Sequence, residues 1–132
     1  MLLIALTGGT PAYRTEVARR LDKEGKAQLV AYEVPARARG RHMRLAEEIV
    51  EAERMGRGGL VITHIITTEE AEVIRARGGA IWCVMGSVSD TIPLLRHDPR
   101  VTHFVGGARH YRDCVEVMEE QLARVGQRRL SR

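Results

Sequence analysis

The sequence predicts a three-layer α/β domain built around a mainly parallel sheet of five strands. Apolar runs of strand length alternate with amphipathic segments of helix length along the chain, which is typical of helices covering both faces of one sheet. Residues 2–6 are continuously apolar, as expected of a strand buried in the middle of a parallel sheet. A length of 132 residues suits one compact domain, which we place at residues 1–126, followed by a basic tail at 127–132.

The first half of the chain supplies three strands and two helices. A glycine pair follows the first strand and leads into a helix that ends at Gly25. Residues 28–34 are predicted to form the second strand, which Pro35 stops. Apolar positions within residues 45–52 follow the helical period, and residues 60–66 then form the third strand.

The second half continues the alternation with shorter elements. Thr67 or Thr68 can cap a helix, after which residues 80–86 form the fourth strand. Residues 87–100 contain two prolines and predict a short helix and a loop. Residues 101–107 are expected to form a fifth, shorter strand. A closing helix follows, with apolar side chains on one face at Tyr111, Val115, Met118, Leu122 and Val125.

The composition indicates an ordinary globular protein. Hydrophobic residues make up 44% of the chain and charged residues 29%, which excludes a disordered protein. No apolar run approaches the roughly 20 residues of a membrane span, and the first residues lack the basic stretch and cleavage site of a signal peptide. Cys83 and Cys114 fit no metal-ligand spacing, and two such thiols favour a reducing compartment. We therefore expect a cytoplasmic protein without membrane association.

Arginine carries almost all of the net charge of +4. One arginine cluster follows the second predicted strand, and another lies near the carboxyl end of the chain. Such clusters contact phosphate, nucleic acid or an acidic protein, or they belong to a solvated loop and tail. The absence of interleaved aromatic residues for base stacking favours the solvated alternative. The candidates for binding a partner are Arg37, Arg39, Arg41 and Arg44.

The stretch LTGGTPAYRTEVARRL, residues 6–21, has the outline of a phosphate-binding loop that leads into a helix. Gly8 and Thr15 occupy the first and last positions of the pattern G-x-x-x-x-G-K-[ST]. Tyr13 and Arg14 stand where that pattern has glycine and lysine, so a ring crowds the phosphate space and a guanidinium replaces an ammonium. An ordinary strand-to-helix turn is the alternative. The residues expected to retain some phosphate or nucleotide binding are Gly8, Gly9, Thr10, Arg14 and Thr15.

Three segments together resemble a known family. They are LLIALTGGTPAYRTEVARRL, GLVITHIITTEEAEVIRARGGAIWCV and DPRVTHFVGGARHYRDCVEVMEEQL, which cover most of the chain. They are similar to segments of the phage-encoded deoxynucleoside monophosphate kinases, which are P-loop kinases related to dephospho-coenzyme A kinase. The resemblance implies a P-loop kinase-like fold, a phage protein in the host cytoplasm, and transfer of the ATP γ-phosphoryl group with the help of Mg²⁺.

The chain departs from that family at the positions that carry the reaction. Where the family has a magnesium-side aspartate and an arginine that faces phosphate or substrate, this chain has His64 and Ile66. The family's asparagine becomes Glu69, and only Glu70 is retained. A neutral histidine supplies neither the charge nor the hard oxygen that magnesium prefers. Because phosphoryl transfer depends on positioning and charge neutralisation, we expect no catalytic residue and no cofactor, and ATP with Mg²⁺ only if the chain is an active kinase after all.

Other polar residues are candidates for contacts with a ligand. Ser87, Ser89 and Asp90 follow the fourth predicted strand, at the edge where parallel sheets bind ligands. His64 and Glu70 follow the third strand and join this group. The five histidines show no paired ligand spacing, so we expect no metal site.

Three functions are compatible with these patterns. The first is a catalytically degenerate kinase-like protein that binds a macromolecule, either a protein or a nucleic acid. The second is an active kinase that phosphorylates a deoxynucleoside monophosphate with a variant loop. The third is a sensor or structural subunit that binds a mononucleotide without turning it over. Each leaves homodimerisation through a helix face open.

Overall fold

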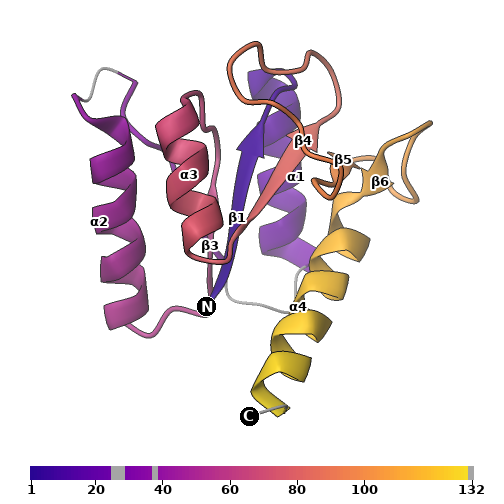
Figure 1. The fold of residues 1–132 in the computed structure, drawn as a ribbon. Coiled ribbons are helices and arrows are strands. Elements are labelled where there is room, and N and C mark those ends of the chain that lie inside the picture. Colours follow the sequence, from indigo (N-terminus) through magenta and orange to yellow (C-terminus); the bar gives the residue numbers. More distant parts are fainter. Residues whose placement is uncertain (25–28, 37–38, 131–132) are drawn as a thin grey trace.

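A six-stranded parallel sheet forms the centre of the molecule (Figure 1). The computed structural model describes residues 1–24, 29–36 and 39–130, with 126–130 described by their backbone alone. The strands follow the order β2-β3-β1-β4-β5-β6 and all pair in parallel. Their bounds are β1 Leu2–Thr7, β2 Leu29–Tyr32, β3 Gly59–Ile62, β4 Ala80–Val84, β5 Arg100–Thr102 and β6 Arg112–Asp113.

Four helices in the described part of the chain complete the three layers. They are α1 Pro11–Glu24, α2 Arg41–Arg54, α3 Thr68–Ala76 and α4 Cys114–Leu130. Figure 1 shows α2 and α3 on one side of the sheet and α1 and α4 on the other. The predicted α/β class with a mainly parallel sheet is therefore confirmed.

The strand count and several boundaries differ from the sequence-based expectation. The sheet has six strands rather than five, because β6 precedes α4 in a stretch expected to be helical. Residues 87–100 contain turns but no helix. The fifth strand ends at Thr102, well before residue 107. Helix α4 continues to Leu130, so most of the expected tail at 127–132 extends this helix.

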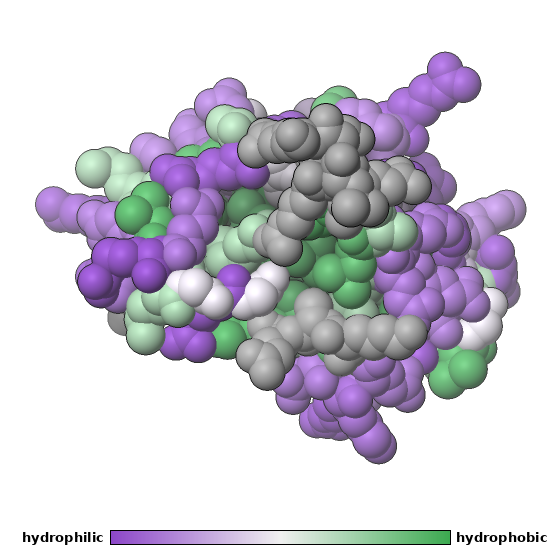
Figure 2. Space-filling model, turned by 90° about the horizontal axis from the view of Figure 1, so that it is seen from below, coloured by the Kyte–Doolittle hydropathy of each residue, from purple (hydrophilic) through white to green (hydrophobic). Residues whose placement is uncertain are grey.

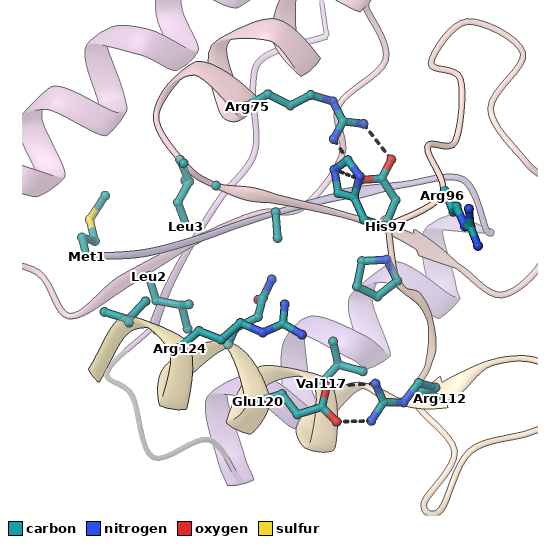
Figure 3. Close-up of a pocket in the computed structure, with 17 residues that line it drawn as sticks. Met1, Leu2, Leu3, Arg75, Arg96, His97, Arg112, Val117, Glu120 and Arg124 are labelled. Carbon is teal, nitrogen blue, oxygen red and sulfur yellow. Dashed lines mark hydrogen bonds and ion pairs between the residues drawn. The ribbon is translucent and has the colours of Figure 1, made fainter. Parts of the chain in front are cut away.

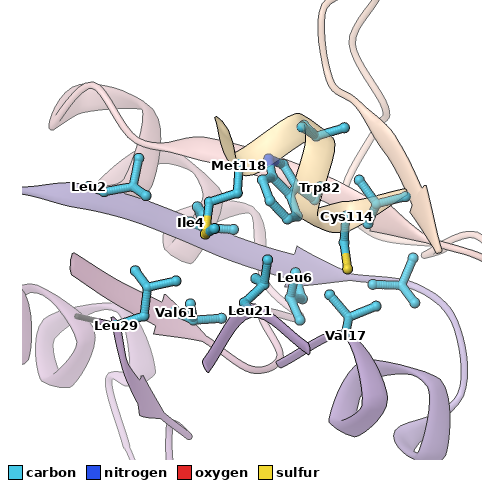
Figure 4. Packing of buried hydrophobic residues seen from close by; sticks show 13 residues of the cluster. Leu2, Ile4, Leu6, Val17, Leu21, Leu29, Val61, Trp82, Cys114 and Met118 are labelled. Atoms are coloured by element: carbon cyan, nitrogen blue, oxygen red, sulfur yellow. The ribbon is translucent and has the colours of Figure 1, made fainter. Parts of the chain in front are cut away.

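Strand β1 lies at the centre of the core, as its sequence predicts. All six of its residues are buried, and β3 and β4 flank it. Its alternate residues Leu2, Ile4 and Leu6 pack with α1, α4 and the fully buried Trp82 (Figure 4). Leu3 and Ala5 belong to a second cluster with α2 and α3. Burial of apolar side chains on both faces is what fixes a continuous apolar run in the middle of a parallel sheet.

The parallel arrangement gives the sheet two distinct edges. The carboxyl edge is formed by the ends of the strands, from which the chain enters the loops that follow β1, β3, β4 and β5. The amino edge is formed by the starts of the same strands, near the amino terminus in Figure 1. Ligands of open parallel sheets bind beyond the carboxyl edge, so the candidate site is sought there first.

Candidate functional site

The loop between β1 and α1 lies against the end of β4. Gly8 and Gly9 both have φ of 69°, a left-handed conformation that glycine adopts without strain. The Gly9 N–H donates to the Ser87 carbonyl at 2.7 Å, and a Cβ at Gly9 would lie 2.8 Å from a Val84 methyl group. Both glycines are therefore required by the turn and by its close approach to the neighbouring strand.

The side chain of Arg14 binds the backbone of this loop. Its Nη1 donates to the Gly8 carbonyl at 2.8 Å and to the Gly9 carbonyl at 3.2 Å. Burial lowers the pKa of the Arg14 guanidinium, and the nearby Glu33 carboxylate opposes that shift. In a phosphate-binding loop the cation at this position reaches the terminal phosphates instead. Here the cation is bound to carbonyls of the loop itself.

Two threonine side chains at the start of α1 form hydrogen bonds with the backbone of the same segment. The Thr10 hydroxyl accepts a hydrogen bond from the Tyr13 N–H at 3.1 Å and caps the helix. The Thr15 hydroxyl, which would hold Mg²⁺ in a working loop, donates to the Pro11 carbonyl at 2.9 Å. The Tyr13 ring lies 5.1 Å from the His103 ring and points toward β5. The group bound to the loop carbonyls is therefore the Arg14 guanidinium, while the Tyr13 ring contacts His103.

A shallow pocket of about 310 Å³ lies beside the loop. Arg14 and Thr15 line one side of it, and Glu33, Thr63 and His64 line the other. Burial, followed by the charges of Arg14 and Arg41, lowers the pKa of His64, so this imidazole is neutral at pH 7. The structure therefore brings His64 together with Arg14 and Thr15, and the carboxylate in this lining comes from Glu33, just after β2.

Glu70 and Arg41 form a buried pair that supports the fold. The Arg41 Nε lies 3.0 Å from a Glu70 carboxylate oxygen, and the Glu70 side chain is fully buried. Glu70 also completes a capping box with Thr67 at the start of α3. Arg41 donates further hydrogen bonds to the carbonyls of Val34 and Pro35 at 3.2 and 3.0 Å. Both side chains are thus engaged within the fold, and their expected roles in ligand or partner binding stay predictions.

The remaining candidates are distributed over the surface. Arg39 and Arg44 are exposed, and Arg37 lies outside the described residues. The Ser89 hydroxyl accepts hydrogen bonds from Thr91 and Ile92 and holds a turn.

The turn after β4 leaves two candidates at the surface. Ser87 and Asp90 are exposed beside the carboxyl edge. Ser87 contacts the loop between β1 and α1 through its backbone, since its carbonyl accepts a hydrogen bond from the Gly9 N–H.

The loops of the carboxyl edge expose apolar side chains, of which only Ile66 was singled out from the sequence. Ile66 follows β3, Val88 follows β4, and Phe104 with Val105 follow β5. Their exposed fractions are 38% for Ile66, 55% for Val88, 45% for Phe104 and 81% for Val105. The only sequence signal was the position of each residue just after a predicted strand or at its end. Contiguous apolar surface of this kind would suit contact with another molecule.

The described part of the chain shows neither a metal-ligand cluster nor a membrane-spanning helix. Within the described ranges, no group of three or more histidine, cysteine, aspartate or glutamate side chains could hold a metal ion. None of the described helices combines the length and the apolar character needed to cross a bilayer.

Comparisons with protein-family models, with curated proteins and with solved structures found no match to this chain.

Proposed function

We propose that this chain is a P-loop kinase-like domain that does not transfer phosphate and that acts by binding a protein partner. The observation that carries the proposal is the contact of Arg14, whose guanidinium binds the Gly8 and Gly9 carbonyls. The lysine of a working loop reaches the terminal phosphates, whereas this cation is held by the backbone of its own loop.

Other groups that phosphoryl transfer needs are also missing from the pocket. The Thr15 hydroxyl is bound to the helix backbone, and His64 is neutral at pH 7. Ile66 offers no hydrogen bond to an equatorial phosphate oxygen. Transferring a phosphoryl group depends almost entirely on charge neutralisation by such groups, so the arrangement supports a protein without kinase activity.

The kinase-like part of the proposal is supported by local architecture. The buried strand β1 runs into a glycine-containing turn, and this turn runs directly into α1. Strand, glycine loop and helix in this order form the unit that carries the phosphate loop of P-loop proteins. The sequence resemblance covers the same unit.

A protein partner fits the carboxyl edge better than nucleic acid does. Ile66, Val88, Phe104 and Val105 present apolar surface there, whereas nucleic-acid surfaces combine arginines with aromatic stacking platforms. Arg41 is bound inside the fold and is unavailable for phosphate contacts. We therefore place the partner on the loops that follow β3, β4 and β5.

A coupled assay of ADP release tests the loss of catalysis. Purified chain with ATP, Mg²⁺ and each deoxynucleoside monophosphate is expected to release no ADP above background. Kinases turn over at about 1–100 s⁻¹, so activity in that range by the unmutated chain would overturn the proposal. A Tyr13→Gly, Arg14→Lys double variant, checked for folding by circular dichroism, shows whether a restored loop gains activity.

Thermal unfolding with nucleotides tests the sensor alternative. A nucleotide that binds only the folded state raises the melting temperature by mass action. We expect no rise with millimolar ATP, dATP or monophosphates for the unmutated chain, because the Arg14 guanidinium is already bound to the Gly8 and Gly9 carbonyls. A clear rise that Arg14→Ala leaves unchanged would favour a nucleotide-binding protein.

Two further measurements separate protein from nucleic-acid partners. Fluorescence anisotropy with labelled single- and double-stranded DNA at low salt should show no binding, whereas salt-sensitive binding would favour nucleic acid. In differential cross-linking in lysate, Phe104→Ser with Val105→Ser should remove a contact that the unmutated chain makes. Met43→Ser with Val50→Ser, which changes exposed apolar residues of α2, is the matched control and should retain that contact.

A further inference from the structure

A second cavity, with a volume of about 420 Å³, opens at the amino edge of the sheet (Figure 3). The starts of β1 and β4 and one face of α4 line it, so it lies at the opposite end of the strands from the Arg14 loop. Leu2, Leu3 and Val117 contribute apolar surface to its wall. Figure 2 views the molecule from this end and shows apolar surface near the middle, with hydrophilic surface toward the outside. Cavities of roughly 300–1,000 Å³ bind small organic ligands.

Both carboxylates that line the cavity are already paired with arginine. Arg75 binds Asp98 through two hydrogen bonds of 2.9 and 2.7 Å. Arg112 makes a second two-point contact with Glu120. These two-point pairs neutralise both carboxylates, which are then unavailable to a ligand in the cavity.

The cavity retains cationic groups that have no partner within the described chain. Arg96 and Arg124 also line it, and neither makes an ion pair or a side-chain hydrogen bond with another described residue. The Arg124 side chain extends from α4 toward the middle of the cavity in Figure 3. With the acids paired, the remaining charge of the lining is positive and favours an anion.

One polar atom in the wall also lacks a partner. The Gln121 Oε1 is buried and accepts no hydrogen bond from any described residue. Gln121 lines the same cavity as Arg124, one turn earlier on α4. A buried acceptor without a donor costs about 1–3 kcal/mol, but an acceptor does not bind an anionic head, so the choice of an anion rests on the arginines alone.

We propose that the amino-edge cavity binds a small amphiphilic anion, with a carboxylate or phosphate head on an apolar body. The head lies at Arg124, with Arg96 at the rim, and the apolar body lies against Leu2, Leu3 and Val117. The combination of an apolar wall with unpaired guanidinium groups selects this chemistry over a neutral apolar molecule or a cation. The site is independent of the carboxyl-edge surface.

Calorimetric titration of the full chain with ligands of one chain length tests the site. Octanoate and octyl phosphate are the anionic probes, and octylammonium and octanol are the controls that lack the negative head. At least one anionic probe should bind more tightly than both controls. Preference for octanoate identifies a carboxylate site, and preference for octyl phosphate identifies a phosphate site. No binding of either anion at millimolar concentration, or equal binding of octylammonium, overturns the proposal.

Two variants locate the binding on the molecule. Arg124→Gln should weaken binding of the anionic probe at least about tenfold, since it removes a charge-assisted contact. Arg19→Gln removes an exposed arginine of α1 that does not line the cavity, and it should leave the affinity unchanged. Shortening the chain from octanoate to hexanoate should weaken binding by about fourfold for each methylene removed. An Arg124→Gln variant that melts normally and binds as well as the unmutated chain would place the ligand elsewhere and refute the site.

Discussion

Glu70 shows how a residue that resembles a functional one can serve the fold. Its carboxylate is fully buried and is held by Arg41 from α2 and by the Thr67 hydroxyl at 3.0 Å. These contacts join α2 to the start of α3, two elements that pack on the same face of the sheet. The glutamate at this position therefore stabilises the packing of α2 against α3, and its presence carries no implication for catalysis.

Removing the Glu70 carboxylate should destabilise the protein strongly. Glu70→Ala leaves the Arg41 guanidinium without its counter-charge, and breaking one side of a buried pair costs about 3–5 kcal/mol. Urea denaturation measures the change in the free energy of unfolding. Glu69→Ala changes the neighbouring exposed glutamate and should cost no more than about 0.5 kcal/mol. Equal losses in the two variants would contradict the structural role of Glu70.

His64 should make stability depend on pH below neutrality. Burial and the charges of Arg14 and Arg41 hold its pKa in the folded protein below the usual 6.5. The unfolded chain then binds a proton more readily than the folded protein as the pH falls below about 6.5, so stability is lost toward acid pH.

A comparison of His64→Gln with the unmutated chain between pH 8 and pH 5, by urea denaturation at each pH, isolates this contribution. The variant should lose less stability over this range. His110→Gln replaces an exposed histidine and should keep the acid dependence of the unmutated chain. Identical profiles for the unmutated chain and His64→Gln would remove the assignment.

At the scale of single elements, the loop between β1 and α1 should respond to glycine substitution in two separable ways. Gly9 and Gly56 share a φ of 69°, so alanine at either position carries the left-handed strain of about 1–2 kcal/mol. Only at Gly9 does the new Cβ also meet a side chain, at 2.8 Å from Val84, while nothing lies within 4 Å at Gly56.

Thermal or urea denaturation should therefore show a larger loss for Gly9→Ala than for Gly56→Ala. The difference measures the overlap with β4, because the backbone strain is common to both variants. A loss at Gly9 no greater than the loss at Gly56 would mean that the loop moves freely away from β4.

The elements that apolar patterns determine were predicted well. Strand β1 and the helices on either side of the sheet follow from continuous or helical apolar spacing, which reports burial directly. Strand β6 was missed because it consists of Arg112 and Asp113, which form a strand through pairing with β5 and carry no apolar signal. Residues 87–100 lost their expected helix for a related reason, since two prolines and a held turn at Ser89 stabilise an irregular path.

Candidate-site residues were harder to predict because their roles depend on contacts between distant segments. The pairing of Arg41 with Glu70 joins residues 29 positions apart, and no local sequence pattern indicates it. The direction of the Arg14 side chain is equally invisible in the sequence, which gives its charge but not its rotamer. Charge type was thus predictable, whereas the partner of each charge was not.

At the scale of the whole molecule, one sheet connects two buried clusters and should make unfolding cooperative. Strand β1 contributes alternate residues to both clusters, so neither cluster survives without it. Trp82 is the single tryptophan and is fully buried in one cluster, which makes its fluorescence a local probe.

Denaturation followed by Trp82 fluorescence and by far-ultraviolet circular dichroism should give coincident transitions in urea. Coincidence is expected because helices on both faces and the Trp82 environment depend on the same strand. Two separated midpoints would show that the α2–α3 layer unfolds independently of the α1–α4 layer.

The central position of β1 has a consequence for biosynthesis. Its neighbours in the sheet, β3 and β4, are supplied by residues 59–62 and 80–84, so β1 has no strand partner during synthesis until residues 59–62 have emerged. An apolar strand without hydrogen-bonded neighbours readily pairs with other exposed strands. Shielding of the β1 segment until the later strands arrive is therefore expected to reduce aggregation during synthesis.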